Sequence, residues 1–208
     1  GMMGFIQCTE HNSYRQASES DIYWQGYSFL AYGAKGIWYY NYRIASDSFG
    51  DGFVTETEGN PTQMYYDAQK FNGEVKNLGP ILMSLKSEGV WHTGNLPLGT
   101  IGYTDGSVTG LDSFTGSDFI VAEFSNMDDP ADDDVYIMVV NKKHGMGLDV
   151  NDSSLLSSFT FTVNSAYQYV YYYDYSNGQL QSISNPYGFS NVGGGQGILI
   201  RLSSDQEN

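Results

Sequence analysis

The spacing of the apolar residues changes near Gly89, and this change limits the folds open to the chain. Before it, apolar residues between positions 65 and 85 recur at the helical period of 3.6. After it, short segments such as residues 158–164 alternate polar and apolar side chains, which is typical of strands. We therefore expect two parts, residues 1–88 and residues 89–208, and an α+β fold.

The first part begins with the pattern strand, helix, strand. Residues 4–11 are an apolar run that ends in polar residues, as in a buried strand. Ser18 and Asp21 fit a capping box at the start of a helix, for which Gly33 is a plausible end. Residues 36–42 then form a second strand that is dense in aromatic side chains.

A long second helix completes this part. Asn60 and Pro61 are suited to its N-cap and first position. Gly79-Pro80 lies inside the apolar stripe, where a kink or break is expected because proline lacks the backbone N–H. The order βαβα implies parallel strands, and two such strands cannot bury both faces alone. This part must therefore contact the second domain, another chain or missing barrel strands.

The second part is rich in short strands and turns. The Asn177-Gly178 pair is a strong hairpin signal. Roughly seven or eight strands in this part predict an antiparallel β-sandwich. They are expected near residues 99–103, 108–111, 118–125, 135–141, 158–164, 168–175 and 197–202.

Charge and cysteine content exclude several classes of partner and site. Lys and Arg number 9 against 24 Asp and Glu, a formal charge of −15. Such a surface repels nucleic acid and anionic membranes, whereas neutral glycans are not repelled. Cys8 is the only cysteine and the three histidines share no metal-ligand spacing, so we expect no metal and no cofactor. No apolar run of about 18 residues is present to span a membrane.

Several motifs of the first part resemble the seventh and eighth units of (β/α)8 glycoside hydrolases. They are Arg15, AYGAKGI at 31–37 followed by Trp-Tyr-Tyr at 38–40, FNGEV at 71–75 and LGPIL at 78–82. The nearest likeness is to family 42-like β-galactosidases and related glycosyl hydrolases of gut bacteria. The rest of the chain resembles the β-sandwich that often follows the barrel. The resemblance thus implies a partial (β/α) barrel followed by an antiparallel β-sandwich, with barrel units one to six absent.

The resemblance also implies a catalytic position. Glu10 ends the first strand, where members of this clan carry the nucleophile at the carboxyl edge of the barrel. A retaining mechanism needs two carboxyl groups about 5–5.5 Å apart, and the acid/base residue of the family has no counterpart here. The alternatives left open are that Glu10 is a solvated loop carboxylate and that Gln7 is the matching polar position.

Other polar and aromatic side chains near the same strand ends are candidates for binding a sugar. Three of them have an alternative interpretation. His11 and Arg15 could be polar loop residues that include an ion pair at the helix entry, and Trp38 could be a core residue. The substrate-binding candidates are Gln7, His11, Arg15, Trp38, Tyr40 and Arg43.

Two acidic segments could in principle attract Ca²⁺. Neither has the spacing of an EF-hand loop, so solvated loops are expected instead. The first contains Asp47, Asp51, Glu56 and Glu58, and the second Asp128, Asp129, Asp132, Asp133 and Asp134.

The resemblance therefore implies part of a glycoside hydrolase that acts on carbohydrate and is inactive as an isolated chain. A non-catalytic carbohydrate-binding or structural module is the alternative. Because the strand pair has free edges, a homodimer through residues 1–87 or a missing barrel half is the expected protein partner. The compartment stays open, with the exterior or cell envelope of a bacterium favoured.

Overall fold

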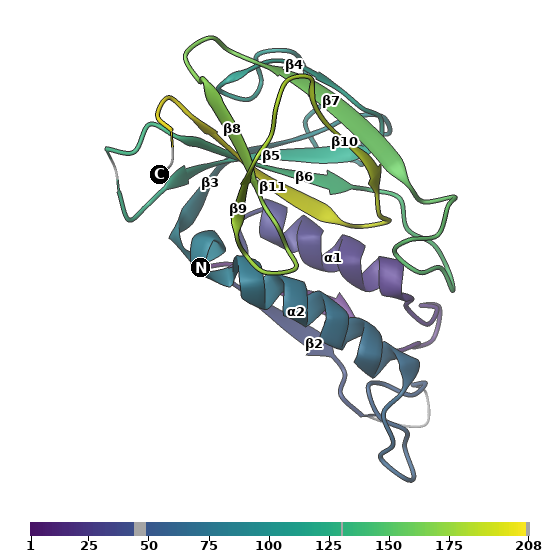
Figure 1. The fold of residues 1–208 in the computed structure, drawn as a ribbon. Helices are drawn as coiled ribbons and strands as arrows, with labels where there is room; N and C mark the ends of the chain where they lie inside the picture. Colours follow the sequence, from purple (N-terminus) through teal and green to yellow (C-terminus); the bar gives the residue numbers. More distant parts are fainter. Residues whose placement is uncertain (44–48, 130, 207–208) are drawn as a thin grey trace.

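The computed structural model describes residues 1–43, 49–129 and 131–206 (Figure 1). Within them the chain forms the predicted βαβα order and then only strands. The elements are β1 (Met3–Gln7), α1 (Glu19–Ala31), β2 (Gly36–Tyr40), α2 (Gln63–Ser84), β3 (Leu85–His92), β4 (Leu111–Thr115), β5 (Phe119–Asn126), β6 (Val135–Asn141), β7 (Ser157–Val163), β8 (Tyr169–Tyr173), β9 (Leu180–Ser182), β10 (Tyr187–Val192) and β11 (Gly197–Ser203).

The first two strands are parallel, as predicted. Their register runs from Met3 opposite Gly36 to Gln7 opposite Tyr40. Between them, α1 begins at the predicted capping box, in which Ser18 and Asp21 exchange side-chain and backbone hydrogen bonds. The described residues contain a small parallel β-α-β unit and no closed barrel.

The second helix differs from the prediction at its start. It begins at Gln63 with Thr62 as N-cap, because the preceding segment pairs with a neighbouring loop through a bridge between Val54 and Pro61. It also continues through Pro80 to Ser84, so no break occurs there. Among the described residues, no helix has the length and hydropathy needed to cross a membrane.

The strands after α2 form two antiparallel sheets, which confirms the predicted pairing. One has six strands in the order β3-β5-β6-β11-β8-β9, and the other has three in the order β10-β7-β4. β3 follows α2 directly, so strand pairing begins before the boundary expected at residue 88. Residues 99–103 do not form the expected strand and contribute a single bridge between His92 and Gly102.

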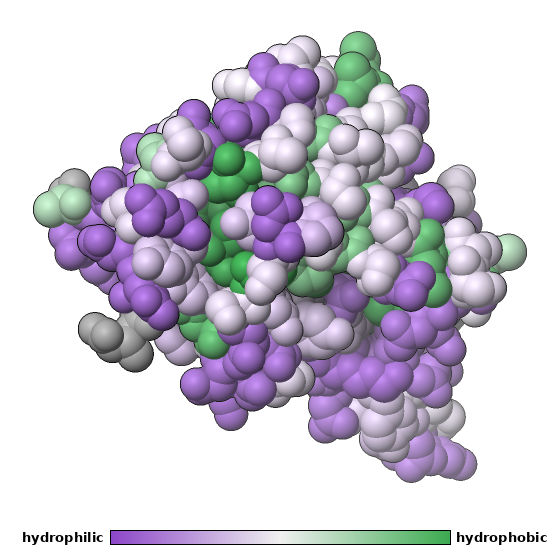
Figure 2. All heavy atoms as spheres, turned by 45° about the horizontal axis from the view of Figure 1, so that its top comes forward, coloured by the Kyte–Doolittle hydropathy of each residue, from purple (hydrophilic) through white to green (hydrophobic). Residues whose placement is uncertain are grey.

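Alternating residues of the six-stranded sheet belong to two different cores. Ile120, Met138 and Leu199 face the helices, whereas Val121 and Val139 face the three-stranded sheet. Figure 1 shows α1 and α2 beneath the six-stranded sheet, with β2 beyond α2. Figure 2 shows the sandwich side, where hydrophilic residues enclose a hydrophobic patch. The helices are thus covered by strands on two sides, whereas among the described residues the β1–β2 pair is covered by helices on one side only.

Candidate functional site

The carboxyl ends of β1 and β2 lie side by side, because the two strands are parallel and in register. The loops that follow them are joined by backbone contacts. The N–H of Gly50 donates to the carbonyl of Glu10 at 3.0 Å, and Thr9 Oγ1 donates to the carbonyl of Gly50 at 2.7 Å. These contacts bring residues from three segments together, and we call Glu10, His11, Tyr40 and Phe49 the strand-end site.

Three rings of the strand-end site form a platform. The rings of His11 and Phe49 are stacked with centroids 3.9 Å apart and planes 12° apart. Tyr40 meets Phe49 edge-on at 5.7 Å. Stacked and edge-on rings are favourable aromatic geometries, and their flat faces suit the apolar face of a sugar ring. Sequence reasoning identified His11 and Tyr40 but missed Phe49, which lies in a loop with no periodic signal.

Glu10 lies beside this platform with its backbone tied on both sides. Its N–H donates to Gln16 Oε1 at 3.0 Å, and its side chain is exposed. Its carboxylate makes no hydrogen bond or ion pair with any residue that the structure describes. In the neighbouring loop, Asp51 Oδ1 accepts from the N–H of Glu56 at 3.0 Å, so that carboxylate serves its own loop. Glu10 is thus a free carboxylate next to aromatic rings.

Three predicted binding residues hold the surrounding loops. Gln7 Nε2 donates to the carbonyls of Thr9 (3.0 Å) and Arg15 (2.9 Å). The Arg15 guanidinium makes two bonds to Asp21, at 2.5 and 2.8 Å, which is the helix-entry ion pair that the sequence left open. Arg43 donates to the carbonyl of Glu56. These side chains position the loops of the strand-end site.

Trp38 lies on the sheet face that points away from the helices. It is 55% exposed, so the interpretation of Trp38 as a core residue is wrong. Phe5, 65% exposed, stacks on it with centroids 6.3 Å apart, and Trp38 Nε1 lies 3.1 Å from the sulfur of Met3. We call Met3, Phe5, Trp38 and Tyr40 the open sheet face. Among the described residues, β1 and β2 pair only with each other, so this apolar face is bounded by free strand edges.

A second polar centre joins α1 to the sandwich. The Asp21 carboxylate accepts from His144 Nδ1 at 2.6 Å in addition to Arg15, and the His144 ring stacks on Trp24 at 4.2 Å. A groove of about 290 Å³ lies there and also includes Gln7. His144 is far from Asp21 in the chain, so no spacing in the sequence indicated this contact.

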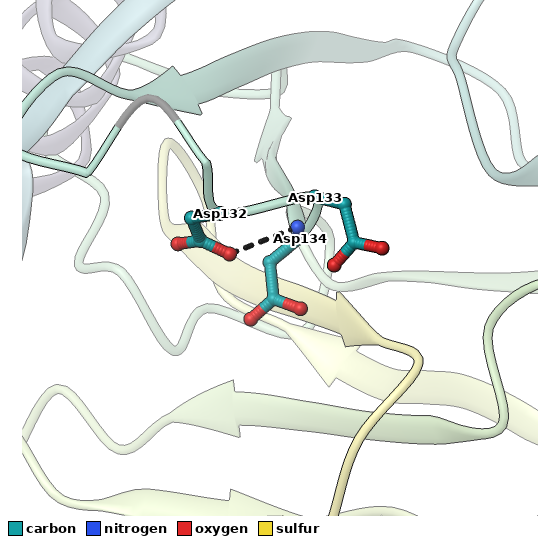
Figure 3. A group of neighbouring side chains, drawn as sticks. All are labelled: Asp132, Asp133 and Asp134. Atoms are coloured by element: carbon teal, nitrogen blue, oxygen red, sulfur yellow. Dashed lines mark hydrogen bonds between the residues drawn. The ribbon is translucent and has the colours of Figure 1, made fainter.

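The acidic turn before β6 is held by protein donors. Figure 3 shows Asp132, Asp133 and Asp134 on this turn, with the N–H of Asp134 donating to Asp132 at 2.9 Å. Asp132 also accepts from Asn126 Nδ2 at 3.0 Å, and Asp134 pairs with Arg201. Burial acts to raise the pKa of Asp132, but these hydrogen bonds outweigh it and lower that pKa. Two of the three carboxylates thus have protein partners.

The earlier acidic loop is described in part. Asp47 lies outside the described residues. Asp51 and Glu58 bind within their own loop, since Glu58 Oε2 accepts from Asn60 Nδ2 at 2.6 Å. The expectation that neither segment holds a metal stays a prediction.

Chemically, the described residues of the strand-end site offer three aromatic rings in contact and the carboxylate of Glu10. A single carboxylate cannot both protonate a leaving group and attack the anomeric carbon. The arrangement therefore suits binding of a sugar more than its hydrolysis. Comparison with known proteins gave no match to a family model and no match to a curated protein.

Proposed function

We propose that the strand-end site binds carbohydrate and that the chain is part of a glycoside hydrolase. In this proposal β1, α1, β2 and α2 are the last two units of a (β/α) barrel, and the sandwich is the domain that follows it. The supporting observation is the platform of His11, Phe49 and Tyr40 beside the free carboxylate of Glu10. In this proposal Glu10, which lies beyond the end of β1 at Gln7 and not in the strand as expected, is the nucleophile, and the acid/base partner would come from the remainder of the barrel.

A non-catalytic carbohydrate-binding module is the second candidate. The same platform would serve it, and the single carboxylate of Glu10 would then accept hydrogen bonds from sugar hydroxyls. The two functions differ in one measurable respect. Only the hydrolase gains turnover when the remainder of a barrel is supplied.

The platform is tested by titration with neutral sugars. Replacing His11 or Tyr40 by alanine is expected to weaken binding of galactose and its oligosaccharides about tenfold, since an aromatic contact contributes up to about 1.5 kcal/mol. Isothermal titration calorimetry measures the change. Tyr66→Ala is the matched control, because Tyr66 is an exposed tyrosine of α2 outside the strand-end site. Equal affinities of all variants would exclude this site.

The same samples test the catalytic part of the proposal. The chain alone should not hydrolyse aryl glycosides, because the acid/base residue of the family that the chain resembles has no counterpart in this sequence. Hydrolysis that is abolished by Glu10→Gln would show that this chain is a complete catalyst and would contradict the partial-barrel proposal.

We also propose that a protein partner covers the open sheet face: a second copy of the chain or the missing barrel half. Free strand edges recruit strands, and exposed apolar faces mark interfaces. The purified chain is therefore expected to show a mass above 23.1 kDa by light scattering at micromolar concentration. Trp38→Lys should restore the monomer. A lysine makes the net charge less negative, so the loss of association would not reflect greater repulsion.

Tyr66→Lys is the control for this substitution, since it makes the same charge change at an exposed ring outside the open sheet face. It should leave the mass unchanged. A wild-type mass near 23.1 kDa, constant on dilution and in high salt, would contradict self-association.

A further inference from the structure

Cationic side chains gather on one surface of this acidic protein. The chain has 9 Lys and Arg against 24 Asp and Glu. Three of those cations, Arg15, Lys142 and Lys143, line two grooves of about 290 and 220 Å³ that share Trp24. His144 lines the larger groove and stacks on Trp24 with the planes 16° apart. We call Arg15, Trp24, Lys142, Lys143 and His144 the Trp24 saddle.

The basic run 142–144 is fixed where it begins. Asn141 is fully buried, and its Nδ2 donates to the carbonyls of Leu155 (2.8 Å) and of Val192 and Gly193 (3.0 Å each). Its Oδ1 accepts from the N–H of Lys143 at 3.0 Å. Side chains on a backbone that is already ordered lose less entropy on binding a ligand.

The run is also fixed where it ends. The N–H of Gly145 donates to Ser20 Oγ at 3.2 Å, and the N–H of Ser20 donates to the carbonyl of Leu148, also at 3.2 Å. These bonds attach the loop after β6 to the first turn of α1. Trp24 lies in the next turn of the same helix. The cations and the indole therefore belong to one ordered surface.

The carboxylates at the saddle already have partners. Among the described residues that line the two grooves, the acids are Asp21 and Asp118. Asp21 accepts from Arg15 and His144, and Asp118 Oδ1 accepts from the N–H of Asn95 at 3.1 Å. Three permanent cations thus stand against two carboxylates, so the saddle carries a local positive charge in a chain of net charge −15.

The lysines at the saddle contact backbone carbonyls. Lys142 Nζ donates to the carbonyl of Thr93 at 2.7 Å, and Lys143 Nζ to that of Leu156 at 3.4 Å. A carbonyl oxygen orients an ammonium group but does not cancel its charge. Lys142 Nζ also donates to the carbonyl of Asn95, so Lys143 makes the longest of the three bonds and exchanges it for a ligand oxygen most readily.

We propose that the Trp24 saddle binds an acidic sugar residue, with the sugar ring against the indole of Trp24 and its carboxylate on Lys143. An aromatic ring contacts the C–H face of a sugar, and an ammonium group pairs with a carboxylate. A neutral sugar offers the lysine hydroxyl oxygens but no charge, and a simple carboxylate makes no contact with the ring. This site is separate from the strand-end site and does not depend on its function.

The test compares ligands that differ in one feature. The probes are D-glucuronate and D-galacturonate, with D-glucose, D-galactose and acetate at equal ionic strength as controls. Binding is followed by the NMR signal of the Trp24 indole N–H, which is assigned among the three tryptophans by its loss in Trp24→Phe. Both uronates are expected to bind at least about tenfold more tightly than their neutral counterparts, as a difference of about 1.4 kcal/mol gives.

Variants assign the contact to the named side chains. Lys143→Gln should lower the affinity for uronate to that for the neutral sugar, and Trp24→Phe should weaken both. Lys76→Gln, the same charge change on an exposed residue of α2, should have no effect. The proposal is overturned if acetate or glucose matches glucuronate, or if Lys143→Gln binds uronate as the wild type does. These outcomes do not bear on the function proposed for the strand-end site, because that function is tested with neutral sugars and with variants of His11 and Tyr40.

Discussion

Replacing Asp21 by asparagine is expected to destabilise the protein by about 1–3 kcal/mol at pH 7, as is typical when several donors lose a buried acceptor. The Asp21 side chain is 6% exposed and accepts bonds from Arg15 at 2.5 and 2.8 Å, from His144 at 2.6 Å and from the N–H of Ser18 at 2.8 Å. An amide has one acceptor oxygen, so its NH₂ group would face one of these donors. Urea unfolding at pH 7 measures the loss.

The pH dependence gives this prediction a sign. Burial acts to raise the pKa of Asp21, but the hydrogen bonds from His144, Arg15 and Ser18 outweigh it and hold that pKa well below its usual range. A lowered native pKa contributes stability that is fully present above the unfolded value of about 3.9 and is lost as the pH falls toward the native value. The difference between wild type and Asp21→Asn should therefore be full at pH 6–7 and shrink below about pH 4.

Glu74 provides the matched control. Burial raises its pKa although Tyr27 and Tyr23 both donate to its carboxylate at 2.8 Å. Its contribution has the opposite sign: it is present below the ordinary carboxyl pKa and is lost as the pH rises through the raised value. The loss of unfolding free energy caused by Glu74→Gln should therefore not become smaller as the pH falls from 7 to 3. A wild-type advantage over Asp21→Asn that is constant from pH 7 to pH 3 would contradict the assigned role of Asp21.

The second large effect is expected at the contact between the two helices. Gly26 of α1 faces Phe71 of α2, and a Cβ there would lie 2.1 Å from Phe71 Cζ. Phe71 is fully buried, with the rings of Tyr23 and Tyr27 at 5.3 and 5.5 Å, so it cannot move aside. Gly26→Ala should cost about 1–3 kcal/mol through overpacking, despite the higher helix propensity of alanine.

Gly73 supplies the comparison, because it is also a helical glycine and a Cβ there would meet no described atom within 4 Å. Gly73→Ala should stabilise the protein by about 0.5–1 kcal/mol, the usual gain from replacing glycine in a helix. Denaturant unfolding measures the free energy of unfolding of both variants. A Gly26→Ala variant as stable as Gly73→Ala would show that α1 and α2 do not approach so closely.

Features that depend on neighbouring residues could be predicted from the sequence. The capping box of Ser18 and Asp21 spans only four residues, and it starts α1 as predicted. The change from helical to alternating spacing separates α2 from the strands, and the order βαβα led to the parallel pair. In each case the signal is local, because backbone geometry alone places residues at fixed spacings on one face.

Features that depend on distant residues were decided by the tertiary structure. The sequence placed Trp38 in the core as an alternative, but the face opposite the helices has no described cover. Phe49 stacks on His11 because the loop after β2 is hydrogen-bonded to the loop after β1, through the N–H of Gly50 and the carbonyl of Glu10.

The contact between Asp21 and His144 shows the reason most clearly. The two residues lie 123 positions apart, and no periodicity relates them. Whether a helix start meets a given loop depends on how the whole six-stranded sheet packs on α1. The sequence by itself therefore determined the βαβα order, the parallel pair and the antiparallel character of the strands that follow, but it did not indicate β3, β9 or β10. The tertiary structure alone decided which side chains from separate elements meet, because such contacts arise from packing and leave no spacing in the chain.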